Sequence, residues 1–270
     1  MTARPTLSVV LPSYKSAAVA RANVGVLAEH LRASKIESEL IIVDDGSCDG
    51  GETERVATEL GCRYLQNPRN QGKGAAVRRG MLAARGRLRV FTDIDVPYEL
   101  ESFDRLLYYL AFKGFHFVTG DRTLEESTYY TEISLARRIA SEVYSTAVGR
   151  FLAGGWFDTQ CGLKGFQDHV AEDLFGVGRI DRFAFDVELF YVAVKRNYDI
   201  KRVPVQLRSN ETSSVHVVRD AAVMLRDLGS IRLNQLLGAY TSRQSPRRTE
   251  DDTDEVQRWR EEWLIGGDER

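Results

Sequence analysis

Two aspartates, Asp93 and Asp95, directly follow a short apolar stretch that begins at Leu88 and ends at Phe91. Side chains alternate along an extended strand, so acids two positions apart point the same way where the strand ends. Two such carboxylates repel each other unless a cation or a hydrogen-bond donor lies between them. Magnesium takes one or two carboxylates and completes its coordination with water and substrate phosphates. The pair therefore indicates a divalent-cation site, although an Asp-x-Asp sequence alone is also typical of a polar turn.

Further polar and aromatic residues follow two other strand-like segments. Leu7–Leu11 and Leu40–Val43 are continuous apolar runs, typical of strands that are buried on both faces. Tyr14 follows the first run, and Asp44 and Asp45 follow the second. Helical patterns separate the runs, and this alternation predicts an α/β fold with a mainly parallel sheet flanked by helices. Because ligands bind beyond the carboxyl ends of such strands, we expect these residues and the aspartate pair at one edge.

A glycine-rich helix start lies between these strands. Gly72, Lys73 and Gly74 precede an apolar face at helical spacing. Glycines there let a ligand approach the exposed backbone N–H groups, which favour an anion. The spacing matches neither the Walker loop nor the G-x-G-x-x-G dinucleotide motif. The segment therefore indicates an anion-binding helix start or, alternatively, an ordinary helix cap with a solvated lysine.

Arg122 follows another predicted strand, which runs from Phe115 to Val118. Its planar guanidinium group can hold a phosphate through two hydrogen bonds. The structural alternative is a salt bridge to Asp121 or Glu125.

Two later groups of polar residues are further candidates. Asp158 and Gln160 lie between aromatic residues, which is typical of a pocket wall or of a capped turn before a strand at Leu163–Phe166. Asp186 and Glu188 open a helix, where acids often only match the helix dipole. Helical spacing also predicts a helix from residue 133 to 152, and a last strand is predicted at 200–205.

Composition narrows the class of protein. A chain of 270 residues can form one domain with a sizeable core, and its net charge of −2 gives no argument for nucleic acid as a partner. Three separated cysteines and four scattered histidines suggest neither a disulfide framework nor a metal-ligand spacing. We find no signal peptide and no run of roughly 18 uncharged apolar residues. These features predict a cytoplasmic protein, soluble or held on a membrane surface.

The C-terminal part is predicted to contain an amphipathic helix and a tail. Apolar residues at helical spacing between 217 and 237 alternate with Arg219, Arg226 and Arg232. Such a helix suits peripheral contact with a membrane, and it equally suits packing on the protein's own sheet. We expect the globular domain to comprise residues 1–244 and the charged residues 245–270 to form a mobile tail.

Six segments along the chain carry a further signal by their order and spacing: VVLPSYKSA, IIVDDGSCDGG, NQGKGAAVRRGML, FTDID, DTQCGLKGF and FAFDVELFYVA. Together they resemble the family 2 inverting glycosyltransferases of the GT-A fold. The resemblance covers residues 7–237 and is nearest to the dolichyl- or polyprenyl-phosphate β-glucosyltransferases, with the mannosyl-phosphate synthases next.

The resemblance implies roles for particular residues. A donor-binding set would hold the nucleotide sugar: Pro12, Tyr14, Val43, Asp45, Lys73, Gly74, Asp93, Ile94 and Arg208. A catalytic set would surround the sugar, the diphosphate and the acceptor: Asp95, Arg122, Asp158, Gln160 and Asp186. Asp95 and Asp93 would bind the cofactor, Mg²⁺ or Mn²⁺. Three features depart from the relatives: Lys15 and Ser16 follow Tyr14 where an acidic residue is usual, Pro97 replaces a metal-binding glutamine of the mannosyl synthases, and Ser214 replaces a lysine.

The expected function is inverting transfer of a sugar from a nucleotide-sugar donor, UDP-glucose by resemblance, to a polyprenyl or dolichyl phosphate. An acceptor phosphate is already anionic, whereas a hydroxyl acceptor needs a base such as Asp158, Asp186 or Glu188. The alternatives are a soluble hydroxyl acceptor, mannosyl transfer from GDP-mannose, and a nucleotide-sugar-binding protein without turnover. The sequence does not determine the oligomeric state.

Overall fold

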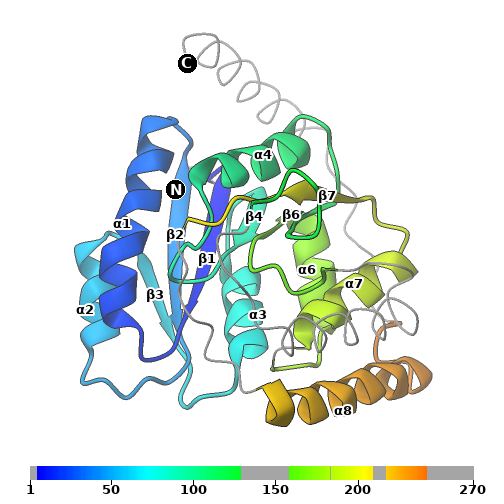
Figure 1. Ribbon diagram of the computed structural model, residues 1–270. Helices are drawn as coiled ribbons and strands as arrows, with labels where there is room; N and C mark the ends of the chain where they lie inside the picture. The colour runs from blue at the N-terminus through cyan, green and yellow to red at the C-terminus, as the bar shows by residue number, and fades with distance from the viewer. Residues whose placement is uncertain (1–4, 129–157, 183, 209–216, 242–270) are drawn as a thin grey trace.

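The computed structural model describes residues 5–128, 158–182, 184–208 and 217–241, with backbone alone for 217–225. In these ranges seven strands form one sheet with the order β3-β2-β1-β4-β6-β5-β7 (Figure 1). The strands are β1 Leu7–Ser13, β2 Ser38–Asp44, β3 Arg63–Gln66, β4 Leu88–Phe91, β5 Phe117–Asp121, β6 Lys164–Gln167 and β7 Ile200–Pro204.

Most neighbouring strands are parallel, as the sequence predicts. β1 pairs in parallel with β2 and β4, β2 with β3, and β5 with β7. β6 lies between β4 and β5 and runs antiparallel to both. Its first residue, Lys164, is therefore in register with Phe91, the last residue of β4. This insertion brings the segment that begins at Asp158 to the edge of the sheet where Asp93 follows β4.

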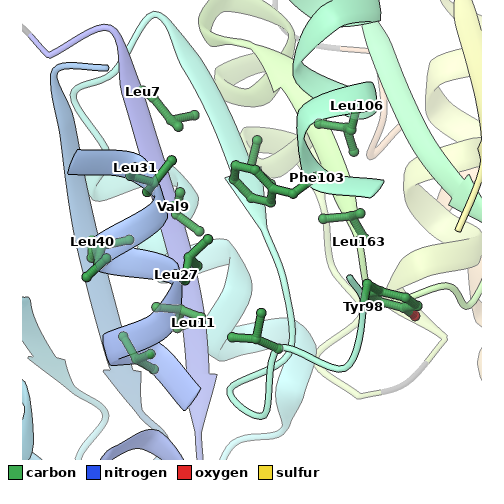
Figure 2. Close-up of a cluster of buried hydrophobic side chains, with 14 of the residues drawn as sticks. Leu7, Val9, Leu11, Leu27, Leu31, Leu40, Tyr98, Phe103, Leu106 and Leu163 are labelled. Carbon is green, nitrogen blue, oxygen red and sulfur yellow. The ribbon is translucent and has the colours of Figure 1, made fainter. Parts of the chain in front are cut away.

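Helices cover both faces of the sheet (Figure 1). One core cluster contains side chains from α1 (Ala17–Ala33), α2 (Glu52–Glu59) and α4 (Leu100–Ala111). The other contains side chains from α3 (Lys73–Ala83), α6 (Asp168–Val177), α7 (Phe185–Lys195) and α8 (Val217–Leu236). Figure 2 shows part of the first cluster, in which Leu27 and Leu31 of α1 lie against Val9 of β1. The alternation of Val9 and Val10 between the two clusters shows that β1 is buried on both faces.

The strand predicted at Phe115–Val118 differs from the observed strand β5. β5 begins at Phe117 instead of Phe115 and continues to Asp121, because its pairing with β7 extends to Pro204. The predicted helix at 133–152 and the predicted tail at 245–270 lie outside the described residues.

α8 packs on its own domain. Leu228 and Ile231 are buried in the second core cluster, whereas Leu233, Leu236 and Leu237 near the end of the helix are 55%, 84% and 74% exposed. No helix in the described ranges has both the length and the apolar character needed to cross a bilayer.

Candidate active site

The aspartate pair lies in a tight turn at the carboxyl end of β4. The N–H of Val96 donates to the carbonyl oxygen of Asp93 at 2.9 Å and closes the turn. Val96 has a φ of 44°, which is rare for a β-branched residue, and its side chain is buried in the first core cluster. Asp93 and Asp95 are both partly exposed, and Ile94 between them is buried. The carboxylates are thus placed at the predicted edge by a turn that the core holds in a strained conformation.

Lys73 at the start of α3 forms an ion pair with Asp93. The side chains are 22% and 32% exposed, so the pair is accessible to solvent. Burial alone would lower the pKa of Lys73, but the charges of Asp93, Asp186 and Asp95 outweigh it and raise that pKa. Lys73 is therefore a charged group of the site and not the solvated cap lysine of the alternative interpretation.

The glycines beside Lys73 are required by packing within the protein. A Cβ at Gly74 would lie 2.7 Å from the Cβ of Phe185, and one at Gly72 would lie 2.5 Å from the carbonyl oxygen of Asp181. Gly72 also has a φ of 110°. The start of α3 is thus fixed against the segment that leads into α7, and this contact sets the position of Lys73.

Tyr14 and Asp45 lie at the ends of neighbouring strands β1 and β2. Tyr14 is 44% exposed, so its ring is accessible to a ligand. The buried carboxylate of Asp45 accepts hydrogen bonds from the amide of Asn67 at 2.7 Å and from the N–H groups of Gln71 and Gly72 at 3.0 and 2.7 Å. In this structure Asp45 therefore orders the loop before α3.

Asp44 connects β2 to β3 and to the loop that follows β2. Its buried carboxylate accepts from the N–H of Ser47 at 3.0 Å, the hydroxyl of Tyr64 at 2.9 Å and the amide of Gln66 at 3.2 Å. Its observed contacts are structural, although it lies at the predicted edge.

Arg122 and Asp158 form a bidentate ion pair. The Nε and Nη2 atoms of Arg122 each donate to Asp158 at 2.8 Å, and the Arg122 N–H also donates at 2.8 Å. Burial tends to raise the pKa of Asp158, but the Arg122 guanidinium more than offsets it, so the pKa is lowered. Asp158 is therefore the partner of Arg122, in place of Asp121 or Glu125, the two acids considered from the sequence. Asp121 instead pairs with Arg202 at 2.6 Å.

A second buried ion pair joins Lys164 to Asp186 at 2.7 Å. Lys164 is fully buried, and its ammonium also donates to the carbonyl oxygen of Cys161 at 2.5 Å. Burial raises the pKa of Asp186, although Lys164 and Lys73 act in the opposite direction. Sequence reasoning missed Lys164. The lysine interrupts an otherwise apolar strand two residues after Gly162, but this pattern does not show that its ammonium is buried.

Glu188 is a structural acid. Its carboxylate accepts from the N–H groups of Arg179 and Ile180 at 2.9 Å and from the hydroxyl of Tyr240 at 2.6 Å. It therefore fixes the start of α7 to the preceding turn and to the segment that follows α8, a role more specific than dipole matching.

The remaining predicted residues are placed as follows. Val43 is fully buried in the second core cluster, and Pro12 is partly buried in β1. Gln160 is partly buried, and Arg208 is exposed. The N–H of Arg208 donates to the carbonyl oxygen of Pro97 at 2.8 Å, which ties the segment after β7 to the loop after the aspartate pair.

The donor set at the end of β4 fits a divalent cation that is shared with a substrate. Asp93 and Asp95 supply carboxylate oxygens, the ligands that magnesium and manganese prefer. Within the described ranges, no group of three or more His, Cys, Asp or Glu is arranged to hold a metal ion. Two protein carboxylates completed by substrate phosphates is the usual arrangement for magnesium.

Two curated relatives are similar over most of the chain. The dolichyl-phosphate β-glucosyltransferase of Dictyostelium discoideum is 32% identical over 217 residues, which cover 76% of this chain and 66% of that protein. The enzyme of the same name from Drosophila melanogaster is 33% identical over 213 residues, with coverages of 75% and 65%. The chain thus spans slightly less than two thirds of the length of these relatives.

Solved structures confirm the GT-A fold. Glucosyl-3-phosphoglycerate synthase from Mycobacterium tuberculosis, in a complex with UDP, superposes with a TM-score of 0.63 at 20% identity. The match covers 89% of this chain and 82% of that protein. The family model described as "Glycosyl transferase family 2" matches residues 8–175, which is more than half of the chain. The chain therefore belongs to glycosyl transferase family 2.

Proposed function

We propose that the protein transfers glucose, with inversion, from UDP-glucose to a polyprenyl phosphate of the dolichyl type. One observation carries the proposal: Lys73, Asp93 and Asp95 are assembled beyond β4 in a chain that is 32% identical to a dolichyl-phosphate β-glucosyltransferase. A cation, a metal-ligand pair and a nearby exposed Tyr14 are the groups that a nucleotide diphosphate sugar requires.

Asp95 and Asp93 would hold Mg²⁺ or Mn²⁺ against the diphosphate. When bound, the cation neutralises the charge that develops on the leaving nucleotide. The mycobacterial synthase of the same fold was crystallised with Mn²⁺ and UDP-glucose, which supports this assignment. In this chain Lys73 adds a second positive charge at the same place.

The state of the acids favours an acceptor that is already an anion. Asp158 is held by Arg122 with a lowered pKa, so it is a weak base. Glu188 accepts hydrogen bonds from backbone N–H groups and from Tyr240. Asp186 is paired with Lys164. A phosphate acceptor attacks without deprotonation, so it needs positioning and no general base. If the acceptor were a hydroxyl compound, Asp186 would be the best placed of these acids, since burial raises its pKa and it interacts electrostatically with Lys73 and Asp93 of the site.

The end of α8 suits contact with a lipid surface. Leu233, Leu236 and Leu237 are exposed, and the neighbouring Arg226 and Arg232 are exposed as well. Apolar side chains beside arginines favour the interface of an anionic membrane. We include in the proposal a peripheral position on the cytoplasmic membrane face through residues 217–237.

In the direct test, purified protein is incubated with UDP-glucose, Mn²⁺ and one of two matched acceptors. These are a short polyprenyl phosphate and the polyprenol of the same chain length. Mass spectrometry should detect glucosyl-phosphopolyprenol and UDP, and no product from the alcohol. The anomeric configuration of the product, determined by NMR, reports inversion. Glucosylation of a soluble hydroxyl compound instead would change the assigned acceptor. Transfer from GDP-mannose alone would change the assigned donor. Donor binding without any product would indicate a binding protein without turnover.

A further inference from the structure

Lys164 is a buried cation to which the proposed reaction assigns no role. It opens β6 beside Phe91 at the end of β4, and it is fully buried. Its ammonium contacts the carbonyl oxygen of Cys161 at 2.5 Å and Asp186 at 2.7 Å. An ammonium removed from water requires compensating partners of this kind. The two contacts therefore link the start of α7, which carries Asp186, to the turn at Cys161 and Gly162.

This turn lies directly against Asp93. A Cβ at Gly162 would collide with the carboxylate of Asp93, so the turn approaches the carboxylate as closely as glycine allows. The N–H of Gly162 donates to the hydroxyl of Tyr98 at 3.0 Å, and Tyr98 belongs to the loop that follows Asp95. A displacement of the turn therefore changes the space that is available to the Asp93 carboxylate.

The start of α7 reaches Asp93 from a second direction. Phe185, the neighbour of Asp186, packs against Gly74 at the start of α3. Lys73 precedes Gly74 and pairs with Asp93. The contacts thus close a ring that passes from Asp93 through α3 and α7 to Lys164 and back through the turn. Lys164 is a charged link between the two halves of this ring.

We infer that Lys164 is a positioning residue of the donor site: by joining Asp186 to the turn at Cys161 and Gly162, it holds the Asp93 carboxylate where the metal–nucleotide donor binds. The inference rests on the proposed function, because it assumes that Asp93 contacts the donor. It differs from a purely structural role, in which the pair would stabilise the fold and leave donor affinity unchanged.

The first test compares Lys164→Met with Arg89→Met. Arg89 is a buried cation on β4 that pairs with Glu172 at 2.8 Å and donates to the carbonyl oxygen of Met81, away from the carboxyl edge. Both variants should melt at a lower temperature. Calorimetric titration with UDP and Mn²⁺, at a temperature where circular dichroism shows both variants folded, should show at least a tenfold loss of affinity in Lys164→Met and an unchanged affinity in Arg89→Met. Unchanged affinity in Lys164→Met would overturn the inference.

A second variant keeps the test decisive if Lys164→Met does not fold. Gly162→Ala retains the buried ion pair and places a methyl group against the Asp93 carboxylate. We expect a similar loss of UDP affinity and a raised KM for the donor with a smaller change in kcat. Where both variants fold, the double variant should lose less than the product of the two single losses, because both act on one turn. Wild-type affinity in Gly162→Ala, or fully multiplicative losses, would contradict the shared path. If the wild-type protein itself does not bind UDP with Mn²⁺, the proposed function fails and not this inference alone.

Discussion

The ammonium of Lys73 lies directly against the carboxylate of Asp93, at the end of β4 where the sequence predicts a divalent cation. A lysine and a metal ion that share one carboxylate compete for it. Lys73 therefore partly neutralises the site, and a bound metal would displace it or share Asp93 with it.

This competition predicts an unusual effect of Lys73→Met. A partly exposed ion pair is worth up to about 1 kcal/mol, which corresponds to roughly fivefold in affinity. Removing the lysine should therefore strengthen the binding of Mn²⁺ alone by up to about that factor, while transfer falls because a positive charge at the diphosphate is lost. Calorimetric titration with MnCl₂ measures the first effect. Lys113→Met, a change at an exposed lysine on another part of the surface, should bind Mn²⁺ like the wild type. Weaker or unchanged Mn²⁺ binding in Lys73→Met would show that the two cations do not compete.

The sequence was sufficient to predict at which edge of the sheet the candidate site lies. The apolar runs before Asp45 and Asp93 identified β2 and β4, and a parallel arrangement places the ends of such strands together. The same reasoning could not identify Lys164 as buried, because its burial depends on the insertion of β6 between β4 and β5. Pairing between strands far apart in sequence has no local signal.

Partners of charged residues were equally inaccessible to local reasoning. The alternatives for Arg122 were acids within three positions, whereas its partner Asp158 is 36 residues away. α2 and β3 also went unpredicted, since α2 buries only Thr53, Val56 and Ala57 and β3 is a four-residue edge strand with no fully buried side chain.

The Arg122–Asp158 pair should make folding stability depend on pH in the acid range. The folded-state pKa of Asp158 is below its usual value of 3.8, so the pair's contribution is fully present above that value. The contribution is lost as the pH falls through the lower folded-state pKa. The melting temperature of Asp158→Asn should therefore lie below that of the wild type at about pH 6, and the difference should shrink at about pH 3. A difference that is constant over this range would mean that the carboxylate charge does not contribute.

Donor choice should favour uridine over guanosine. The resemblance and the relatives both point to a glucosyl donor. A bound nucleotide at a hundred times its dissociation constant stabilises the folded state by about 2.7 kcal/mol, so binding can be detected as a rise in melting temperature. A thermal-shift series with UDP, GDP, UDP-glucose and GDP-mannose, each with and without Mn²⁺, should give its largest Mn²⁺-dependent shift with the uridine nucleotides. A larger shift with GDP would move the assignment to the mannosyl synthases.

The exposed end of α8 should govern membrane association. Replacing Leu233, Leu236 and Leu237 by serine should reduce co-sedimentation with anionic liposomes at least severalfold, because each substitution removes an exposed apolar side chain. Arg226 and Arg232 should each contribute about 1 kcal/mol near an anionic surface. Leu82→Ser, which alters an exposed leucine of α3, is the matched control and should sediment like the wild type. Retained sedimentation of the triple variant would assign membrane contact to another surface.

The protein is proposed to carry out metal-assisted glucosyl transfer to a lipid phosphate at the aspartate pair. The most direct measurement is the rate at which wild type and Asp95→Asn form glucosyl-phosphopolyprenol from UDP-glucose and a short polyprenyl phosphate, with Mn²⁺ and with excess chelator. Asp95→Asn retains the size of the side chain and removes one carboxylate charge from the pair. We predict that the wild type forms product with Mn²⁺ and forms none with excess chelator, and that Asp95→Asn with Mn²⁺ is at least about a hundredfold slower, of the order found when one charge-stabilising group is removed. Full activity in Asp95→Asn, or in wild type with chelator, would contradict the account.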